Sequence, residues 1–222
     1  MKNLNEDNLD ALLQGARVIE EDGYGIKVAC LASGDYLKLY RRKRLLSSAL
    51  WSPPARRFAD NAEHLRRLNI PAPTIVETLR VPSRKLNGVR YQPLPGDTLR
   101  SHWQALDDER RAAEVERFGA FLGQLHELGV YFRSLHLGNV LILPDGRFGL
   151  IDLSDMQISG RPLARWKRER NLQHMLRYAE DSHWLTVLHR QNLLSGYAQY
   201  CGRVSADRLA QALRRLQGAG EH

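Results

Sequence analysis

The order of apolar and polar positions predicts strands in the first part of the chain. Short runs rich in β-branched and aromatic residues are separated by turns that contain Gly, Asp or Ser, a pattern typical of antiparallel strands with tight connections. A small amphipathic helix is expected before them, over Leu9 to Leu13. The predicted strands cover residues 16–21, 26–32, 36–40, 74–81 and 89–92.

One helix is predicted among these strands, and helical periodicity dominates the chain from Asp107 onward. The first helix covers residues 55–68, with apolar residues at helical spacing, and ends before Pro71. The helix after Asp107 carries a long apolar stripe that stops at Gly129, as expected of a helix that faces a core. Its stripe consists of Val115, Phe118, Phe121, Leu122, Leu125 and Leu128. Later helices are predicted over residues 163–179, 182–201 and 205–216.

Between the long helix and the last helices lies a predicted β-hairpin with a polar residue at each outer end. Its first strand begins at Val140, residues 144–146 form a Pro-Asp-Gly turn, and the second strand begins at Arg147 and runs to residue 153. Asn139 precedes the first strand, and Asp152 lies near the end of the second. Because the outer ends of a hairpin are neighbours, this amide oxygen and this carboxylate can share one divalent cation. Hard oxygen ligands suit magnesium better than zinc.

These residues resemble the catalytic loop and metal-binding Asp of the protein-kinase fold. Residues 134–139, Ser-Leu-His-Leu-Gly-Asn, are similar to the Asp-Leu-His-Pro-Gly-Asn run of the aminoglycoside, choline and lipopolysaccharide-sugar kinases, and Asp152 follows Asn139 at the family's usual kind of spacing. Taken singly, an Asn or Asp at a strand end is more often a turn former or a cap. As a whole, the chain looks closest to bacterial lipopolysaccharide-core (heptose or Kdo) kinases and the related toluene-tolerance proteins.

The resemblance implies an α+β, bilobal protein-kinase-like fold. The first lobe, residues 1–93, would be a small antiparallel β-sheet with one helix, and the second, residues 94–222, would be mostly helical. The boundary falls in a Pro/Gly-rich segment, residues 93–99, that resembles the interlobe hinge of sugar kinases. The resemblance also implies that Asn139 and Asp152 hold Mg²⁺ on ATP. It further implies that His136 braces the catalytic loop by hydrogen bonds.

Lys38 is an isolated cation between two leucines of the third predicted strand. In the kinase fold a Lys at this place grips the α- and β-phosphates of the nucleotide. The alternative is an ordinary strand lysine that faces solvent. The family also places an acid on the following helix to pair with this Lys, and both Asp60 and Glu63 are candidates here.

Two glycines, Gly23 and Gly25, lie in the turn between the first two predicted strands. The turn resembles a reduced form of the phosphate-covering loop of kinases. Backbone amides can approach a phosphate there because no Cβ stands in the way. Two glycines in a turn are weak support by themselves, since most such turns bind nothing.

One position departs from the family pattern, because Ser134 stands where the family has its catalytic Asp. A serine is not a base at neutral pH, but its hydroxyl can still orient an attacking hydroxyl group. General-base help is worth about 10²- to 10⁴-fold, while positioning and metal charge supply most of the stabilisation in phosphoryl transfer. The presence of Ser134 in place of the Asp therefore predicts slow phosphoryl transfer rather than a complete loss of transfer. Arg133 and Ser134 are expected to line the transfer site.

The net charge of +8 favours anionic partners, which include nucleic acid, an acidic membrane surface and a phosphorylated substrate. Nucleic acid is the least favoured, because the chain has no zinc-finger spacing or RNA-binding aromatic motif. The basic residues 41–44 and the following apolar residues up to Pro54 have two readings of equal weight. They contact an anionic membrane surface or a phosphosugar acceptor, or they form a solvated charge run.

Composition indicates a globular protein, with 43% hydrophobic and 26% charged residues. No apolar run has the length needed to span a bilayer, and Met1 to Leu13 lacks the basic start and apolar stretch of a secretory signal. Cys30 and Cys201 lie far apart without metal-type spacing, and we expect both to be reduced. These features predict a cytoplasmic location, with peripheral contact to the inner membrane left open.

Two functions remain. The first is an ATP-dependent phosphotransferase that uses Mg²⁺ to phosphorylate a sugar hydroxyl of the lipopolysaccharide core or another small molecule. The second is a pseudokinase, a nucleotide- or protein-binding regulatory module, for which Ser134 is the main argument. The retained Lys38, Asn139 and Asp152 favour the enzyme, because a scaffold has no chemical need for all three.

Overall fold

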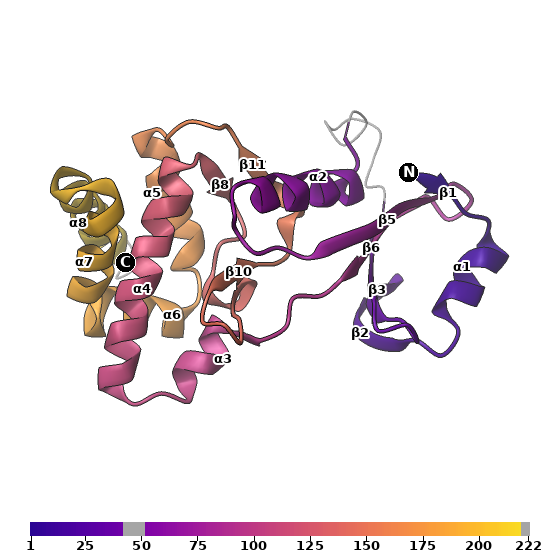
Figure 1. The fold of residues 1–222 in the computed structure, drawn as a ribbon, viewed down its shortest axis with the longest axis horizontal. Coiled ribbons are helices and arrows are strands. Elements are labelled where there is room, and N and C mark those ends of the chain that lie inside the picture. Colours follow the sequence, from indigo (N-terminus) through magenta and orange to yellow (C-terminus); the bar gives the residue numbers. More distant parts are fainter. Residues whose placement is uncertain (42–51, 219–222) are drawn as a thin grey trace. The chain divides into compact units, whose positions relative to one another are not determined.

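The computed structural model describes residues 1–41 and 52–218, so most of the basic segment predicted to meet a membrane or an acceptor lies outside the described residues. The chain forms two compact units (Figure 1). The first contains residues 1–95 and a returning segment, Ile151–Asp155, and the second contains the remaining described residues. One unit is built on a sheet and the other mainly on helices, which confirms the predicted α+β class.

Six strands form the sheet of the first unit, in the spatial order β1-β5-β6-β4-β3-β2. Neighbouring strands are antiparallel, with one exception: β1 is parallel to β5. The sequence did not predict β1, because a strand of two residues has no detectable periodicity. The strands are β1 (Lys2–Asn3), β2 (Arg17–Asp22), β3 (Gly25–Cys30), β4 (Tyr36–Arg41), β5 (Thr74–Val81) and β6 (Leu86–Gln92).

Two helices of the described chain pack on this sheet, a short one that precedes most of the strands and a longer one between β4 and β5. Helix α1 (Glu6–Leu13) is the small amphipathic helix predicted near the start of the chain, and its Leu9 is buried in a cluster with Leu37 and Leu39 of β4. Because side chains alternate along a strand, Lys38 lies on the opposite face from these leucines. Burial of the leucine face of β4 thus determines the side of the sheet to which the Lys38 side chain points.

Helix α2 (Pro54–Arg67) buries an apolar stripe that includes Phe58. The Phe58 ring stacks on Tyr91 of β6, with 5.1 Å between the ring centroids. Tyr91 is the partner of Tyr36 across the β4–β6 ladder, and Tyr36 and Lys38 are two residues apart on one strand. The stacked pair therefore places α2 on the sheet face that carries Lys38.

The second unit is organised around the close approach of two helices, α4 (Asp108–Glu127) and α7 (Arg190–Cys201). A Cβ added to Gly196 would lie 1.8 Å from the carbonyl oxygen of Glu116, and one added to Gly119 would lie 2.3 Å from that of Leu193. Glycine at these positions lets the two backbones touch. The other helices are α3 (Leu99–Gln104), α5 (Arg165–Met175), α6 (Ala179–His183), a π-helix (Trp184–Leu188) and α8 (Arg203–Gly218).

The predicted hairpin is present as β9 (Val140–Ile142) and β10 (Phe148–Leu150), with Val140 opposite Leu150. Its second strand ends three residues earlier than expected, because Ile151–Asp155 leaves the hairpin and groups with the first unit. Strand β7 (Asp97–Thr98) extends this small sheet, and β8 (Val130–Phe132) pairs with β11 (Met156–Ile158). Neither of these pairings was predicted, since the strands have only two or three residues.

The described residues contain no helix that combines the length and the apolar character needed to cross a bilayer. Cys30 and Cys201 form no disulfide in the described residues.

The glycine contact between α4 and α7 makes a test of the second unit. In an open helix position Gly→Ala stabilises by about 1 kcal/mol, but the Cβ of Gly196→Ala would overlap backbone atoms of α4. Overpacking of this kind costs about 1–3 kcal/mol, so we expect a net loss in the free energy of unfolding, measured by urea denaturation. Gly23→Ala, where an added Cβ meets no atom within 4 Å, is the control. An unchanged or raised stability of Gly196→Ala would contradict the close approach.

Candidate active site

The first unit holds an ion pair between Lys38 and Asp152. Lys38 Nζ donates a hydrogen bond to Asp152 Oδ1 over 2.6 Å. The Lys38 side chain is only 17% exposed and that of Asp152 is 38% exposed, so Lys38 is not the ordinary solvent-facing lysine that the sequence left as an alternative. The pair contributes on the order of 1 kcal/mol, because the carboxylate remains partly screened by solvent.

Two tyrosines, Tyr40 and Tyr91, lie near this ion pair. Burial, together with the negative charge of Asp152, raises the pKa of the hydroxyl groups of Tyr40 and Tyr91. Both tyrosines therefore stay neutral, and they lie near enough to the carboxylate for its charge to act on them. A carboxylate in such surroundings needs a cation nearby, which Lys38 supplies here.

Asp152 has a left-handed backbone, with φ of +57°. This conformation costs an L-residue about 1 kcal/mol or more, although Asp tolerates it better than most. The following residues are held from α2: Asn61 Nδ2 donates to the carbonyl oxygen of Leu153 over 2.8 Å, and Arg57 Nε donates to that of Ser154 over 2.9 Å. These two hydrogen bonds offset the strain and fix the turn that presents the carboxylate.

The two acids predicted to pair with Lys38 have other partners. Asp60 lies 3.5 Å from Arg56, and Glu63 lies 2.7 Å from Arg66. The hydrogen bond from Arg66 lowers the pKa of Glu63 to about 2. Both acids lie on the side of α2 that is turned away from its buried apolar stripe. The structure therefore does not bring either acid to Lys38. A contact there needs an acid at a buried position of the helix, and Asn61 is the polar residue at such a position.

The predicted glycine turn joins β2 and β3. Gly25 needs to be glycine, because its φ of +113° disfavours a side chain, whereas Gly23 has ordinary φ and open space around it. Tyr24 between them is 78% exposed. Its backbone N–H is taken by the Asp22 side chain at 2.9 Å. The phosphate-binding role of this turn stays a prediction.

The second unit holds the predicted catalytic loop, which ends in a short 3₁₀ helix, Leu137–Asn139. Asn139 Nδ2 donates to the carbonyl oxygen of Ser134 over 2.9 Å, so the loop closes on itself. The donor end of the amide is thereby occupied, and the acceptor Oδ1 is directed away from that bond. His136 Nδ1 accepts a hydrogen bond from the backbone N–H of Gly138 over 3.1 Å, which is the bracing expected of it.

A buried ion pair between Arg100 and Asp181, which the sequence did not predict, supports the loop by a hydrogen bond to its backbone. The fully buried Asp181 accepts two hydrogen bonds from Arg100, at 2.7 and 2.8 Å, and a third from the backbone N–H of Leu137 at 3.1 Å. Arg100 also lies over the ring of Tyr178, 4.3 Å from its centroid. No sequence signal connects residues 81 positions apart, so only the folded chain reveals this pair.

The two proposed transfer residues lie at the start of the loop. Ser134 is half-buried, while Arg133 is exposed and its carbonyl oxygen accepts a hydrogen bond from Arg177 over 3.3 Å. The Arg133 guanidinium thus stays at the surface of the second unit. The roles of both residues remain predictions.

The oxygen donors Asp152 and Asn139 belong to different units, and each is fixed locally by a hydrogen bond to its own unit. Among the described residues no group of three or more His, Cys, Asp or Glu side chains is arranged to hold a metal. Each of these oxygen donors, taken by itself, is of the kind that suits magnesium, which keeps several waters and takes few protein ligands, better than a closed zinc centre.

The chain was compared with known proteins. No curated protein matches it. One family model does match, described as "Lipopolysaccharide kinase (Kdo/WaaP) family", over residues 97–197. The matched range includes Ser134, Asn139, Asp152 and Asp181 but not Lys38. Residues 97–197 of the chain are thus similar to the lipopolysaccharide kinase (Kdo/WaaP) family, which supports the resemblance seen in the sequence.

Proposed function

We propose that the protein transfers the γ-phosphoryl group of ATP to a hydroxyl group of a lipopolysaccharide-core sugar or another small molecule. The observation that carries the proposal is the Lys38–Asp152 ion pair, together with the family match over residues 97–197. A lysine and a carboxylate that neutralise each other in the free protein can each turn to a ligand of opposite charge. Lys38 would then donate to the phosphates, and Asp152 would ligate Mg²⁺.

The remaining candidate residues take the following roles in this proposal. Asn139 supplies its amide oxygen as a second protein ligand to Mg²⁺, and the backbone amides around Gly23 and Gly25 approach the phosphates. Arg133 offsets charge on the transferred group. When bound, Mg²⁺ would reduce the negative charge that builds up on the phosphate during transfer.

Ser134 orients the acceptor hydroxyl by a hydrogen bond. The acceptor oxygen forms a bond to the γ-phosphorus while the bond from that phosphorus to the β,γ-bridging oxygen breaks, and ADP leaves. The proton of the acceptor passes to solvent or to the transferred phosphate, because a serine hydroxyl cannot hold it at neutral pH. The protein would therefore work without a strong general base.

A cytoplasmic location with contact to the inner membrane is part of the proposal, since ATP and a membrane-linked acceptor would both be within reach there. The free cysteines agree with a reducing compartment. The second candidate function is a pseudokinase, which Ser134 favours because it removes the usual base. That protein would bind nucleotide or a partner without turnover.

The first prediction concerns Mg-ATP binding, measured by calorimetric titration with and without magnesium. Lys38→Met should weaken ATP binding about 10- to 100-fold, because a hydrogen bond to a charged group is worth about 1.5–3 kcal/mol. Asp152→Asn should remove the magnesium-dependent part of the affinity. The exposed residues Lys2 and Asp7 provide matched charge controls as Lys2→Met and Asp7→Asn. Wild-type protein that binds no nucleotide at millimolar ATP would rule out the proposed function.

The second prediction separates the enzyme from the pseudokinase. Ser134→Asp restores the base of the family pattern, so we expect the rate of ATP consumption with a core-sugar acceptor to rise about 10²-fold, with an unchanged Kd for Mg-ATP. Ser134→Ala should lower the rate of the wild type only a few-fold. If the wild type and Ser134→Asp both bind Mg-ATP but neither consumes it, the pseudokinase is correct.

The third prediction concerns the buried pair below the loop. Asp181→Ala leaves Arg100 without its partner and should lower the free energy of unfolding by about 3–5 kcal/mol. Replacement of both residues, Arg100→Met with Asp181→Leu, should recover part of this loss, since apolar residues can replace a buried ion pair. Hydrogen exchange at the Leu137 amide should stay fast in the double variant, and turnover should stay low. Recovered turnover would show that the pair does not position the loop.

A further inference from the structure

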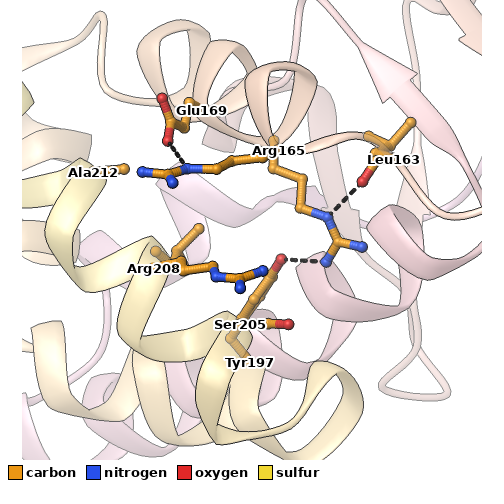
Figure 2. Close-up of a pocket in the computed structure, with 9 residues that line it drawn as sticks. Leu163, Arg165, Glu169, Tyr197, Ser205, Arg208 and Ala212 are labelled. Atoms are coloured by element: carbon orange, nitrogen blue, oxygen red, sulfur yellow. Dashed lines mark hydrogen bonds and ion pairs between the residues drawn. The ribbon is translucent and has the colours of Figure 1, made fainter.

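The second unit has a pocket of about 140 Å³ on the side formed by α5, α7 and α8 (Figure 2). Its volume is roughly ten times the space that one water molecule needs in a cavity. All of its lining residues belong to the second unit, and none is among the residues proposed to bind ATP or the acceptor. They are Leu163, Arg165, Arg168, Glu169, Tyr197, Ser205, Arg208, Leu209 and Ala212.

The charges around the pocket do not balance. Glu169 is shared by two arginines, Arg165 at 2.8 Å and Arg215 at 2.9 Å, and Arg168 pairs with Glu127 at 2.8 Å. Arg208 also lines the pocket, and no acid of the described chain pairs with it. The lining itself thus contains three arginines and one carboxylate, Glu169, which leaves an excess of two positive charges at the pocket.

Two polar residues of the pocket lining, Arg168 and Tyr197, already have hydrogen-bond partners within the protein. Arg168 donates to the hydroxyl oxygen of Tyr197 over 2.9 Å and to the carbonyl oxygen of Leu163 over 2.9 Å. The Tyr197 hydroxyl lies 2.9 Å from His126 Nδ1. Burial lowers the pKa of His126 to about 3, so the imidazole is neutral and can accept the proton of that hydroxyl. Arg168 and Tyr197 are therefore engaged with each other and with neighbouring residues. Few of their hydrogen-bonding groups remain for a ligand.

The groups that remain for a ligand are on α8. Arg208 and Ser205 come from successive turns of this helix and both line the pocket, as Figure 2 shows. Arg208 is exposed and has no ion-pair partner among the described residues. Its guanidinium and the nearby hydroxyl of Ser205 match the oxygens of a phosphate group, which takes two parallel N–H bonds from one arginine. The excess of two charges suits a dianion better than a monoanion.

The lining also has an apolar part, formed by the buried residues Leu163, Leu209 and Ala212. Such a wall gives no hydrogen bonds, but it can cover a few carbon atoms attached to the phosphate. A cavity of about 150 Å³ holds a molecule the size of benzene. The pocket therefore fits a phosphate group with a short carbon chain.

We propose that this pocket binds the phosphate group of a small phosphorylated molecule, with Arg208 and Ser205 as its hydrogen-bond donors. The proposal does not rest on the proposed kinase function, because no residue is shared. Free inorganic phosphate has the same recognition chemistry, so the test compares the two sources.

The test is calorimetric titration of the full chain with inorganic phosphate and, separately, with glycerol 3-phosphate, at fixed ionic strength set with sodium chloride. We expect Arg208→Ala to weaken binding at least 10-fold, while Arg214→Ala, which removes the same charge from an exposed position of α8, leaves it unchanged. Ser205→Leu, which fills the pocket, should abolish binding. Tighter binding of glycerol 3-phosphate than of phosphate would identify the organic ligand as the better occupant.

Phosphate could also bind at Lys38, so Lys38→Met is titrated in parallel and should retain full phosphate binding. Equal loss of binding in Arg208→Ala and Arg214→Ala would reduce the effect to general surface charge and overturn the proposal. Binding that disappears in Lys38→Met but persists in Arg208→Ala would assign the anion to the ion-paired lysine and overturn it as well. Thermal unfolding of each variant without ligand checks that the fold is kept.

Discussion

The ion pair between Lys38 and Asp152 is the interaction on which the candidate site depends. Asp152 comes 114 residues after Lys38 in the chain, yet their charged atoms lie 2.6 Å apart. The carboxylate is presented on a left-handed residue, and such a residue keeps its conformation only where its neighbours hold it. Asn61 and Arg57 provide this hold by binding the two carbonyl groups that follow. One short segment, Ile151–Asp155, thereby becomes part of the first unit and carries the carboxylate to the lysine.

Helix α2 differs from the pattern implied by the family in how it supports the lysine. An acid was expected to pair with Lys38, but Asp60 and Glu63 are engaged by arginines of their own helix. Asn61 occupies the buried position and binds backbone instead. The lysine is therefore positioned by Asp152 rather than by α2. In the second unit the loop before Asn139 is likewise positioned by a residue distant in the sequence. The buried carboxylate of Asp181 accepts a hydrogen bond from the loop backbone.

The catalytic loop and the phosphate pocket use arginine in opposite ways. Arg100 is committed to Asp181 and serves as a rigid support under the loop. Around the pocket, three arginines are tied to acids, while Arg208 has no acidic partner within the described chain. The difference matters because a guanidinium locked in an ion pair has few donors left for a ligand. Part of the excess of positive charge in the chain, which has a net charge of +8, thus lies at this pocket.

The sequence by itself determined the α+β class, most strands and helices, the hairpin between Asn139 and Asp152, and the family resemblance. These depend on local periodicity and on short runs of residues, which a linear chain displays directly. Only the tertiary structure decided which residues meet. It paired Lys38 with Asp152, turned Asp60 and Glu63 away, and placed Asp181 under the catalytic loop. Such contacts join residues far apart in the chain, and their choice depends on the burial of whole helix and sheet faces, which no local pattern encodes.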